Sequence, residues 1–186
     1  MDERLREEFA QWLSDETWRW TTYGTLTFSR PMKKDALRFA RAWVRSIART
    51  ATEVWGFCFQ ETHSDGQHLH VHCLLYVRKN MFGKPSNAEM WRWWYRRFGR
   101  ALVLDYQATA RPREEVKGSD APAFDLLASY LTKYVVKEGA RGGFDWDFFA
   151  YSNGFELGNL EFLRYTGINV SHPGLKRESK WVSSRS

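Results

Sequence analysis

The chain has 186 residues, a formal net charge of +6, 17% aromatic residues including 10 Trp, and two Cys. This length predicts one domain with a sizeable core, which we take as residues 1–175, followed by a basic, flexible tail at 176–186. The charge favours an anionic partner. Two Cys speak against a disulfide scaffold, and no apolar run predicts a signal peptide or a membrane span, so we expect a cytoplasmic protein with no membrane partner.

In the first half of the chain, helical and strand patterns alternate. Apolar residues at helical spacing predict amphipathic helices, whereas apolar residues at every second position predict half-buried strands. A Gly-containing link between two strands, here with Asp65-Gly66, predicts a hairpin. The expected elements are a helix at 3–13, a strand at 18–28, a helix at 35–50, and a hairpin at 54–77.

The second half is less regular. Ser86 and Glu89 have the spacing of a capping box, and Gly99 is placed to stop the helix that the box begins. The expected elements are a helix at 90–98, a strand at 101–108, a charged loop at 111–118, and a helix at 122–137 capped by Asp120. We assign no elements to residues 140–170.

The segment 68–77 carries the most informative pattern in the chain. His68, His70 and His72 fall on one side of this strand, whereas the intervening residues are apolar. His residues at i and i+2 on a strand lie about 6–7 Å apart on one face, close enough to share a cation. A lone strand His usually faces water, but three in alternation beside an apolar face favour a metal site.

The preceding strand adds a carboxylate. The hairpin can bring Glu61 beside the histidine row, so that one acid and two or three imidazoles converge. Mixed nitrogen and oxygen ligands with open positions suit Mn²⁺ or Mg²⁺ for work on phosphates, and do not exclude Zn²⁺.

The helix at 122–137 carries two tyrosines one turn apart. Tyr130 and Tyr134 are each followed three residues later by a lysine, at Lys133 and Lys137, on one stripe of the helix. Exposed Tyr–Lys pairs are usually structural. Beside a metal-binding strand, however, a phenol can act as a covalent nucleophile on a polarised phosphodiester, and a lysine can stabilise the charge.

Three stretches, in order, resemble the motifs of the HUH endonuclease superfamily, and specifically its rolling-circle replication initiators. The segment 24–28 resembles the Thr-bearing first motif, and 66–75 resembles the second, His-hydrophobic-His followed by hydrophobics. The segment 130–137 resembles the third motif in its two-tyrosine form, which is typical of single-stranded-phage initiators.

This resemblance implies an α+β fold, with a central antiparallel sheet and flanking helices, related to the ferredoxin-like and RNA-recognition folds. It implies nicking and joining of single-stranded DNA through a 5′-phosphotyrosine and a free 3′-OH, with Tyr130, Tyr134 or both as nucleophile. The metal would be held by His70, His72 and Glu61, although His68 with His70, or all three histidines, also match.

The expected partner is a single-stranded DNA origin, with or without a hairpin. No P-loop pattern occurs, so unwinding would fall to a host helicase, with a host polymerase extending the 3′-OH. Candidate DNA contacts are basic and aromatic residues of two helices: Arg38, Arg41, Arg45, Trp91, Arg92 and Arg96. The main alternative is a non-catalytic, RNA-recognition-like module that binds single-stranded nucleic acid.

Overall fold

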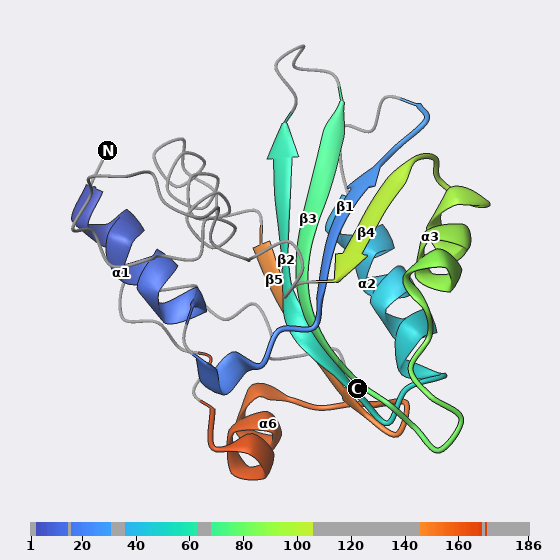
Figure 1. The fold of residues 1–186 in the computed structure, drawn as a ribbon. Coiled ribbons are helices and arrows are strands. Elements are labelled where there is room, and N and C mark those ends of the chain that lie inside the picture. Colours follow the sequence, from blue (N-terminus) through green and yellow to red (C-terminus); the bar gives the residue numbers. More distant parts are fainter. Residues whose placement is uncertain are drawn as a thin grey trace, which may run out of the picture.

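The computed structural model describes residues 3–14, 16–30, 36–62, 68–105, 146–168 and 170. Several predicted segments lie outside these residues: the hairpin link at 63–67, the loop at 111–118, the helix at 122–137, and the tail at 176–186. Over the described residues, one antiparallel sheet carries helices on both faces (Figure 1). This arrangement confirms the predicted α+β class, while the finer ferredoxin-like or RNA-recognition-like assignment stays a prediction.

The sheet has six described strands in the order β4-β1-β3-β2-β5-β6, and every neighbouring pair is antiparallel. β3, which carries the histidines, therefore lies in the interior of the sheet between β1 and β2. The strands are β1 Thr22–Thr27, β2 Glu53–Thr62, β3 Leu69–Arg78, β4 Ala101–Asp105, β5 Trp146–Ser152 and β6 Phe155–Glu156.

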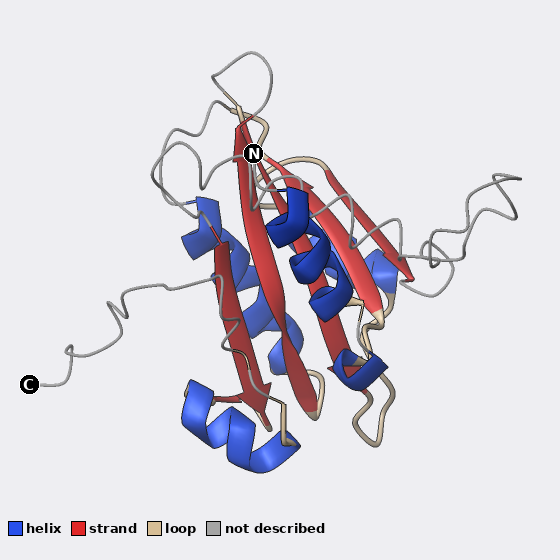
Figure 2. Ribbon diagram, turned by 90° about the vertical axis from the view of Figure 1, so that its left-hand side faces the viewer, coloured by secondary structure: helices blue, strands red, loops and turns tan. Residues whose placement is uncertain are grey.

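Helices cover the two faces of the sheet separately (Figures 1 and 2). The face packed by α2 and α3, here called the α2 face, carries Cys58, Val71, Cys73 and Leu75. The opposite side, here called the histidine face, carries Tyr23, Thr25, Phe59, His70 and His72 and is packed by α1, η1 and α6. The helices are α1 Glu3–Leu13, η1 Glu16–Trp18, α2 Ala36–Ala48, α3 Asn87–Tyr95 and α6 Asn159–Thr166.

The strand predicted at 18–28 begins later than expected. Residues 16–18 form the short helix η1, and β1 starts only at Thr22. Two indoles explain the difference, because Trp18 Nε1 donates to Trp12 O at 2.8 Å and Trp20 Nε1 donates to Leu13 O at 2.7 Å. These bonds anchor the chain to the end of α1 and hold the intervening Arg19 at φ +53°, which is incompatible with a strand.

The helix after the capping box also ends earlier than expected. Ser86 and Glu89 form the reciprocal bonds of the box, as predicted, but the helix ends at Tyr95 instead of residue 98. Gly99, at φ +140°, lies in the turn into β4, where an added Cβ would stand 2.5 Å from Ser29 N. Gly99 is therefore required by the close passage of the chain and not by the helix terminus.

Residues 146–166 form two strands and a helix that the sequence analysis did not assign. The signal was available: Asn153 and Gly154 have φ values of +48° and +80° and link β5 to β6, and Asn-Gly is a strong hairpin signal. Of the nine Trp among the described residues, six are buried, so core packing accounts for much of the aromatic content.

The two cysteines lie opposite each other in β2 and β3 as free thiols, with their Sγ atoms 2.9 Å apart on the α2 face. Burial raises the pKa of Cys58 well above its ordinary value, and a hydrogen bond to Cys73 adds to the shift. The thiol therefore stays protonated. None of the described helices combines the length and the apolar character that a membrane crossing requires.

Candidate metal and nucleic-acid site

The alternation of β3 determines where the histidines point. Val71 and Cys73 are fully buried on the α2 face, so His70 and His72 are directed to the histidine face. His72 is almost fully buried, with 4% of its surface exposed, whereas His70 is half-buried. His68 immediately precedes the strand and is also half-buried.

The two threonines of β1 hold the two histidines. In the register of β1 against β3, Thr25 lies opposite His72 and Thr27 lies opposite His70. Thr25 Oγ1 is 3.2 Å from His72 Nδ1, and Thr27 Oγ1 is 3.2 Å from His70 Nδ1. Each threonine therefore fixes the orientation of one ring through its Nδ1 atom, which directs Nε2 away from β1.

Tyr23 is a member of this site that the sequence analysis did not assign to it. Its hydroxyl lies 3.0 Å from His72 Nδ1 and accepts a hydrogen bond of 3.0 Å from Thr25 Oγ1. Its ring also stacks near the imidazole, with centroids 6.3 Å apart at an interplanar angle of 11°. The available signal was the alternation of β1, which directs Tyr23, Thr25 and Thr27 to one face.

Glu61 approaches the same imidazole from the other side. The hairpin register pairs Glu61 with His70, as the predicted hairpin requires, yet the carboxylate Oε2 lies 3.1 Å from His72 Nε2. The side chain of Glu61 is 21% exposed, and that of His72 is 5% exposed. A carboxylate thus meets an imidazole in a largely dry environment that strengthens their interaction.

The hydroxyl partners of His72 are compatible with either neutral tautomer. With the proton on Nε2, the ring donates to Glu61, and Nδ1 accepts from the Tyr23 hydroxyl. With the proton on Nδ1, the ring donates to Tyr23 or Thr25, which leaves the Nε2 lone pair and the carboxylate directed at the same point. The second arrangement is the one that a metal-binding histidine adopts.

The separation of Glu61 and His72 fits two ligands of one cation. Adjacent ligands in an octahedral shell with bonds of about 2.1 Å stand roughly 3.0 Å apart, and the Oε2–Nε2 distance is 3.1 Å. His70 lies on the same face, opposite Glu61 in the register, and would contribute Nε2. Over the described ranges, no three His, Cys, Asp or Glu side chains already stand together at metal-binding distances, so His70 would have to turn toward the pair.

The predicted nucleophile helix lies outside the described residues, and with it Tyr130, Lys133, Tyr134 and Lys137.

The predicted DNA-contact residues lie on the other side of the sheet from the histidines. Arg38 and Arg45 are exposed on α2, and Arg92 and Arg96 are exposed on α3, where Trp91 stacks on Tyr95 with centroids 4.6 Å apart. Both helices pack on the α2 face. A DNA strand contacting these residues would reach the histidines only by passing around an edge of the sheet.

Arg41 differs from the other arginines of α2. Its guanidinium is 2.8 Å from Asp147 Oδ2 and lies over the ring of Phe149, 5.0 Å from the centroid. This cation is paired with β5, so its structural contacts compete with the predicted contact to a phosphate.

Comparison with known proteins adds no assignment: no family model, no curated protein and no solved structure matches the chain. The function is therefore inferred from the sequence motifs and from the geometry of the histidine face.

Proposed function

We propose that this protein nicks and joins single-stranded DNA by metal-assisted tyrosine transesterification, as an initiator of rolling-circle replication. The observation that supports the proposal most directly is the environment of His72. Its Nδ1 atom is held by Tyr23 and Thr25, while its Nε2 atom meets Glu61 at 3.1 Å. A metal-binding histidine is oriented through its other ring nitrogen, and the hydroxyls behind His72 would serve that role while Nε2 faces a carboxylate ligand.

The residues of the histidine face would hold the cation and maintain its geometry. Glu61, His72 and His70 would bind Mn²⁺ or Mg²⁺, which supplies Lewis-acid polarisation of a DNA phosphate when it is bound. Binding through Nε2 requires the proton of His72 to lie on Nδ1, which then donates a hydrogen bond to the hydroxyl oxygen of Tyr23 or Thr25. Thr27 acts in the same way on His70.

The covalent step is assigned by the motif at residues 130–137. A phenolate oxygen of Tyr130 or Tyr134 attacks the phosphorus, a new P–O bond forms, and the bond to the 3′ oxygen breaks. The 3′ oxygen leaves and takes up a proton, while Lys133 or Lys137 balances the charge on the phosphate. One phosphoester replaces another, so the reverse reaction joins the ends.

The proposed nicking activity is tested by looking for a covalent adduct between the protein and DNA. The protein is incubated with Mn²⁺ and a pool of single-stranded oligonucleotides labelled at the 3′ end, because the protein would retain the 3′-side fragment through its 5′ phosphate. We expect a labelled band that survives denaturant and is absent when EDTA is present. A reversible, salt-sensitive complex with no adduct is the result expected of a nucleic-acid-binding module without catalysis.

Tyrosine variants identify the nucleophile. Tyr130→Phe or Tyr134→Phe should each reduce the adduct, and the double variant should abolish it, because phenylalanine keeps the ring and removes the attacking oxygen. Tyr151→Phe, on β5, is the matched control and should leave the adduct unchanged. An adduct that persists in the double variant would exclude these tyrosines from the mechanism.

A further inference from the structure

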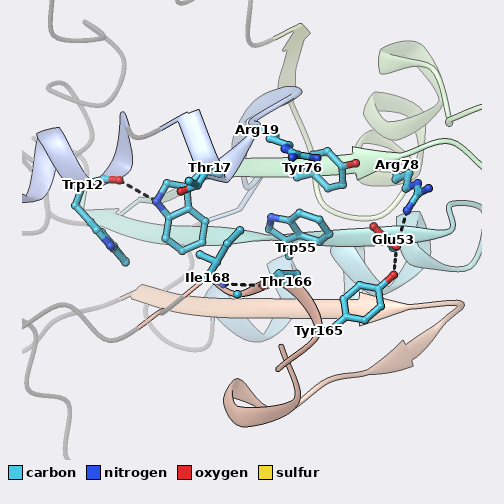
Figure 3. Close-up of a pocket in the computed structure, with 12 residues that line it drawn as sticks. Trp12, Thr17, Arg19, Glu53, Trp55, Tyr76, Arg78, Tyr165, Thr166 and Ile168 are labelled. Carbon is cyan, nitrogen blue, oxygen red and sulfur yellow. Dashed lines mark hydrogen bonds and ion pairs between the residues drawn. The ribbon is translucent and has the colours of Figure 1, made fainter. Parts of the chain in front are cut away.

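A second feature lies at the opposite end of the histidine face from Glu61. A cavity of about 850 Å³ opens between β2, β3, the segment after α1, and the end of α6 (Figure 3). This volume is within the range of sites that bind small organic molecules. The residues that matter for its chemistry are Arg19, Glu53, Trp55, Tyr76, Arg78 and Tyr165.

Two aromatic rings that stack on each other line this cavity. Trp55 of β2 and Tyr76 of β3 are cross-strand neighbours, and their rings stack with centroids 4.0 Å apart and an interplanar angle of 25°. Phe162 of α6 packs edge-on against Trp55 at 5.4 Å, which fixes the indole in place. Because each ring covers one face of the other and Trp55 is only 7% exposed, a planar ligand would stack on the more exposed Tyr76, which is already held in place.

The indole of Trp55 has a hydrogen-bond donor with no acceptor. Trp55 is 7% exposed, its Nε1 atom is buried, and no described residue accepts its hydrogen bond. Figure 3 shows the nitrogen on the edge of the ring that is turned away from Glu53 and Tyr165. An unsatisfied buried donor destabilises the folded state, so a ligand that brings an acceptor to this edge of the cavity would relieve that destabilisation.

An acceptor lies at the other end of the cavity. Glu53 is 4% exposed, and its Oε1 atom accepts hydrogen bonds from Arg78 Nη1 at 3.0 Å and from the hydroxyl of Tyr165. The bond to Glu53 raises the pKa of Tyr165. Both described bonds fall on Oε1, which leaves Oε2 as the carboxylate oxygen that can accept from a ligand.

The cavity is cationic overall. Arg19 and Arg78 line it against the single carboxylate of Glu53. Arg19 is exposed and held at φ +53°, between the two anchored indoles of Trp18 and Trp20, so its backbone conformation is constrained by its neighbours. A non-glycine residue in this region carries strain and is often found at a functional site. The excess positive charge suits a ligand whose ring is attached to a phosphate.

We propose that this cavity binds one base of the single-stranded DNA on which the histidine face acts, and that it selects a base carrying an exocyclic amino group. Cytosine, adenine and guanine each present an amino donor for Glu53 together with an acceptor for Trp55 Nε1. Thymine has no amino group, and its N3–H donor is flanked by two carbonyl oxygens that a carboxylate would repel. The Trp55–Tyr76 pair supplies stacking, and Arg19 and Arg78 meet the phosphates.

The position of the cavity relates this base to the scissile phosphate. Tyr76 and His72 lie on the same face of β3, four residues apart, which is about 13 Å along a strand. The bound base would thus lie a fixed few nucleotides from the phosphate at the histidines. This inference depends on the proposed nicking function for its biological meaning, although binding of the base can be measured without cleavage.

The experiment separates binding from cleavage. Affinity is measured in EDTA for a labelled 20-mer of thymidine and for the same 20-mer with one central dC, dA or dG. We expect at least one substituted oligonucleotide to bind about 5–10-fold more tightly than the thymidine 20-mer, the effect of one well-made polar contact to a base edge. With Mn²⁺ present, the nick should fall at a constant offset from the substituted base.

Three variants test the residues. Glu53→Gln should abolish the preference against thymine, and Trp55→Phe, which keeps a ring but removes the N–H, should weaken binding of the preferred oligonucleotide about fivefold. Replacement of the exposed Tyr165 by Phe removes one hydrogen bond from Glu53 Oε1, which makes the carboxylate a stronger acceptor at Oε2 and should increase the preference. Tyr151→Phe, which removes another unpartnered buried polar atom from the α2 face, is the matched control and should change nothing.

Each outcome bears on one proposal. Equal affinity for all four oligonucleotides would overturn the proposal that the cavity selects a base. The same holds if Glu53→Gln, Trp55→Phe and Tyr165→Phe all fold and all keep the base preference of the wild type. Nicking without a base preference leaves the nicking function intact and removes the cavity from it. A base preference without any adduct supports the cavity and speaks against the nickase.

Discussion

The two faces of the sheet are built from alternate residues of the same strands, yet they differ in chemistry. On the α2 face, Val71, Cys73 and Leu75 of β3 pack against fully buried side chains of α2, such as Val44 and Ile47. On the histidine face, β3 presents His70, His72 and Tyr76, and the covering layer is largely aromatic. The strand buries Leu74 on the histidine face as well, but only on that face does it present imidazole and phenol side chains.

Both faces contribute to stability, because each buries a cluster of apolar side chains under its helices. The candidate chemistry of the described residues, in contrast, lies on one face. The histidine face carries both candidate sites, the Glu61–His72 pair near one end and the cavity over Trp55 and Tyr76 near the other. Variants on the two faces should therefore have separable effects.

The largest expected effect is on the α2 face. Ile47 is fully buried in α2, so Ile47→Ala should reduce the free energy of unfolding by about 2–5 kcal/mol through lost burial and the cavity left behind. Urea denaturation of the wild type and the variant measures this change in the free energy of unfolding. Ser46→Ala on the same helix removes only a bond to Ala42 O and should stay within about 0.5 kcal/mol. If folded Ile47→Ala binds Mn²⁺ much more weakly than the wild type, the two faces are coupled.

The next effect concerns the support of the metal ligands. Thr25→Val keeps the shape of the side chain and removes the hydroxyl that contacts His72 Nδ1, so Mn²⁺ affinity should fall about 10–100-fold. Calorimetric titration with Mn²⁺ measures the change. Thr62→Val, at the exposed end of β2, is the matched control and should bind Mn²⁺ as the wild type does. An affinity within twofold of the wild type in Thr25→Val would show that Thr25 does not orient a metal ligand.

Much of this arrangement could be predicted from local sequence patterns. The alternation in β3 identified both the strand and the face of its histidines, and the Asp65-Gly66 signal brought Glu61 beside them. These features depend on residues close together in the chain, where periodicity and turn chemistry are informative.

The remaining features depend on contacts between distant segments. Tyr23 and His72 are 49 residues apart, and their contact requires the pairing register of β1 with β3. Arg41 and Asp147 are 106 residues apart, so nothing near Arg41 indicated that its charge would be paired. The base cavity likewise combines β2, β3 and α6, and its last element came from residues that we left unassigned.

A third, smaller effect is expected at high pH on the α2 face. Burial raises the pKa of Tyr151 to about 12, and no described residue bonds to its hydroxyl. Below pH 10 the phenol is neutral in both states and its titration has no effect on stability. Between pH 10 and 12 the phenol of the unfolded chain ionises at its ordinary pKa of about 10 while that of the folded chain does not, so the unfolded state is favoured increasingly as the pH rises. The free energy of unfolding should therefore fall by about 1–2 kcal/mol over this interval.

Tyr151→Phe provides the comparison for that titration. The variant should lose less stability between pH 10 and 12, and at neutral pH it should be as stable as the wild type or slightly more so, since an unpartnered buried hydroxyl is removed. Chemical denaturation at several pH values measures both quantities. Identical pH profiles would indicate that Tyr151 titrates at its ordinary pKa.

The smallest effect should come from the exposed arginines of α2. If Arg38 and Arg45 contact DNA phosphates, Arg38→Ala or Arg45→Ala should weaken binding to single-stranded DNA only about threefold and reduce the salt slope by about 0.7 per lost contact. Arg38→Lys, which keeps the charge, should leave the slope unchanged. The cleavage rate of bound DNA should not change in any of these variants, because the histidines lie on the other face. An unaltered slope in Arg38→Ala and Arg45→Ala would mean that the DNA stays on the histidine face.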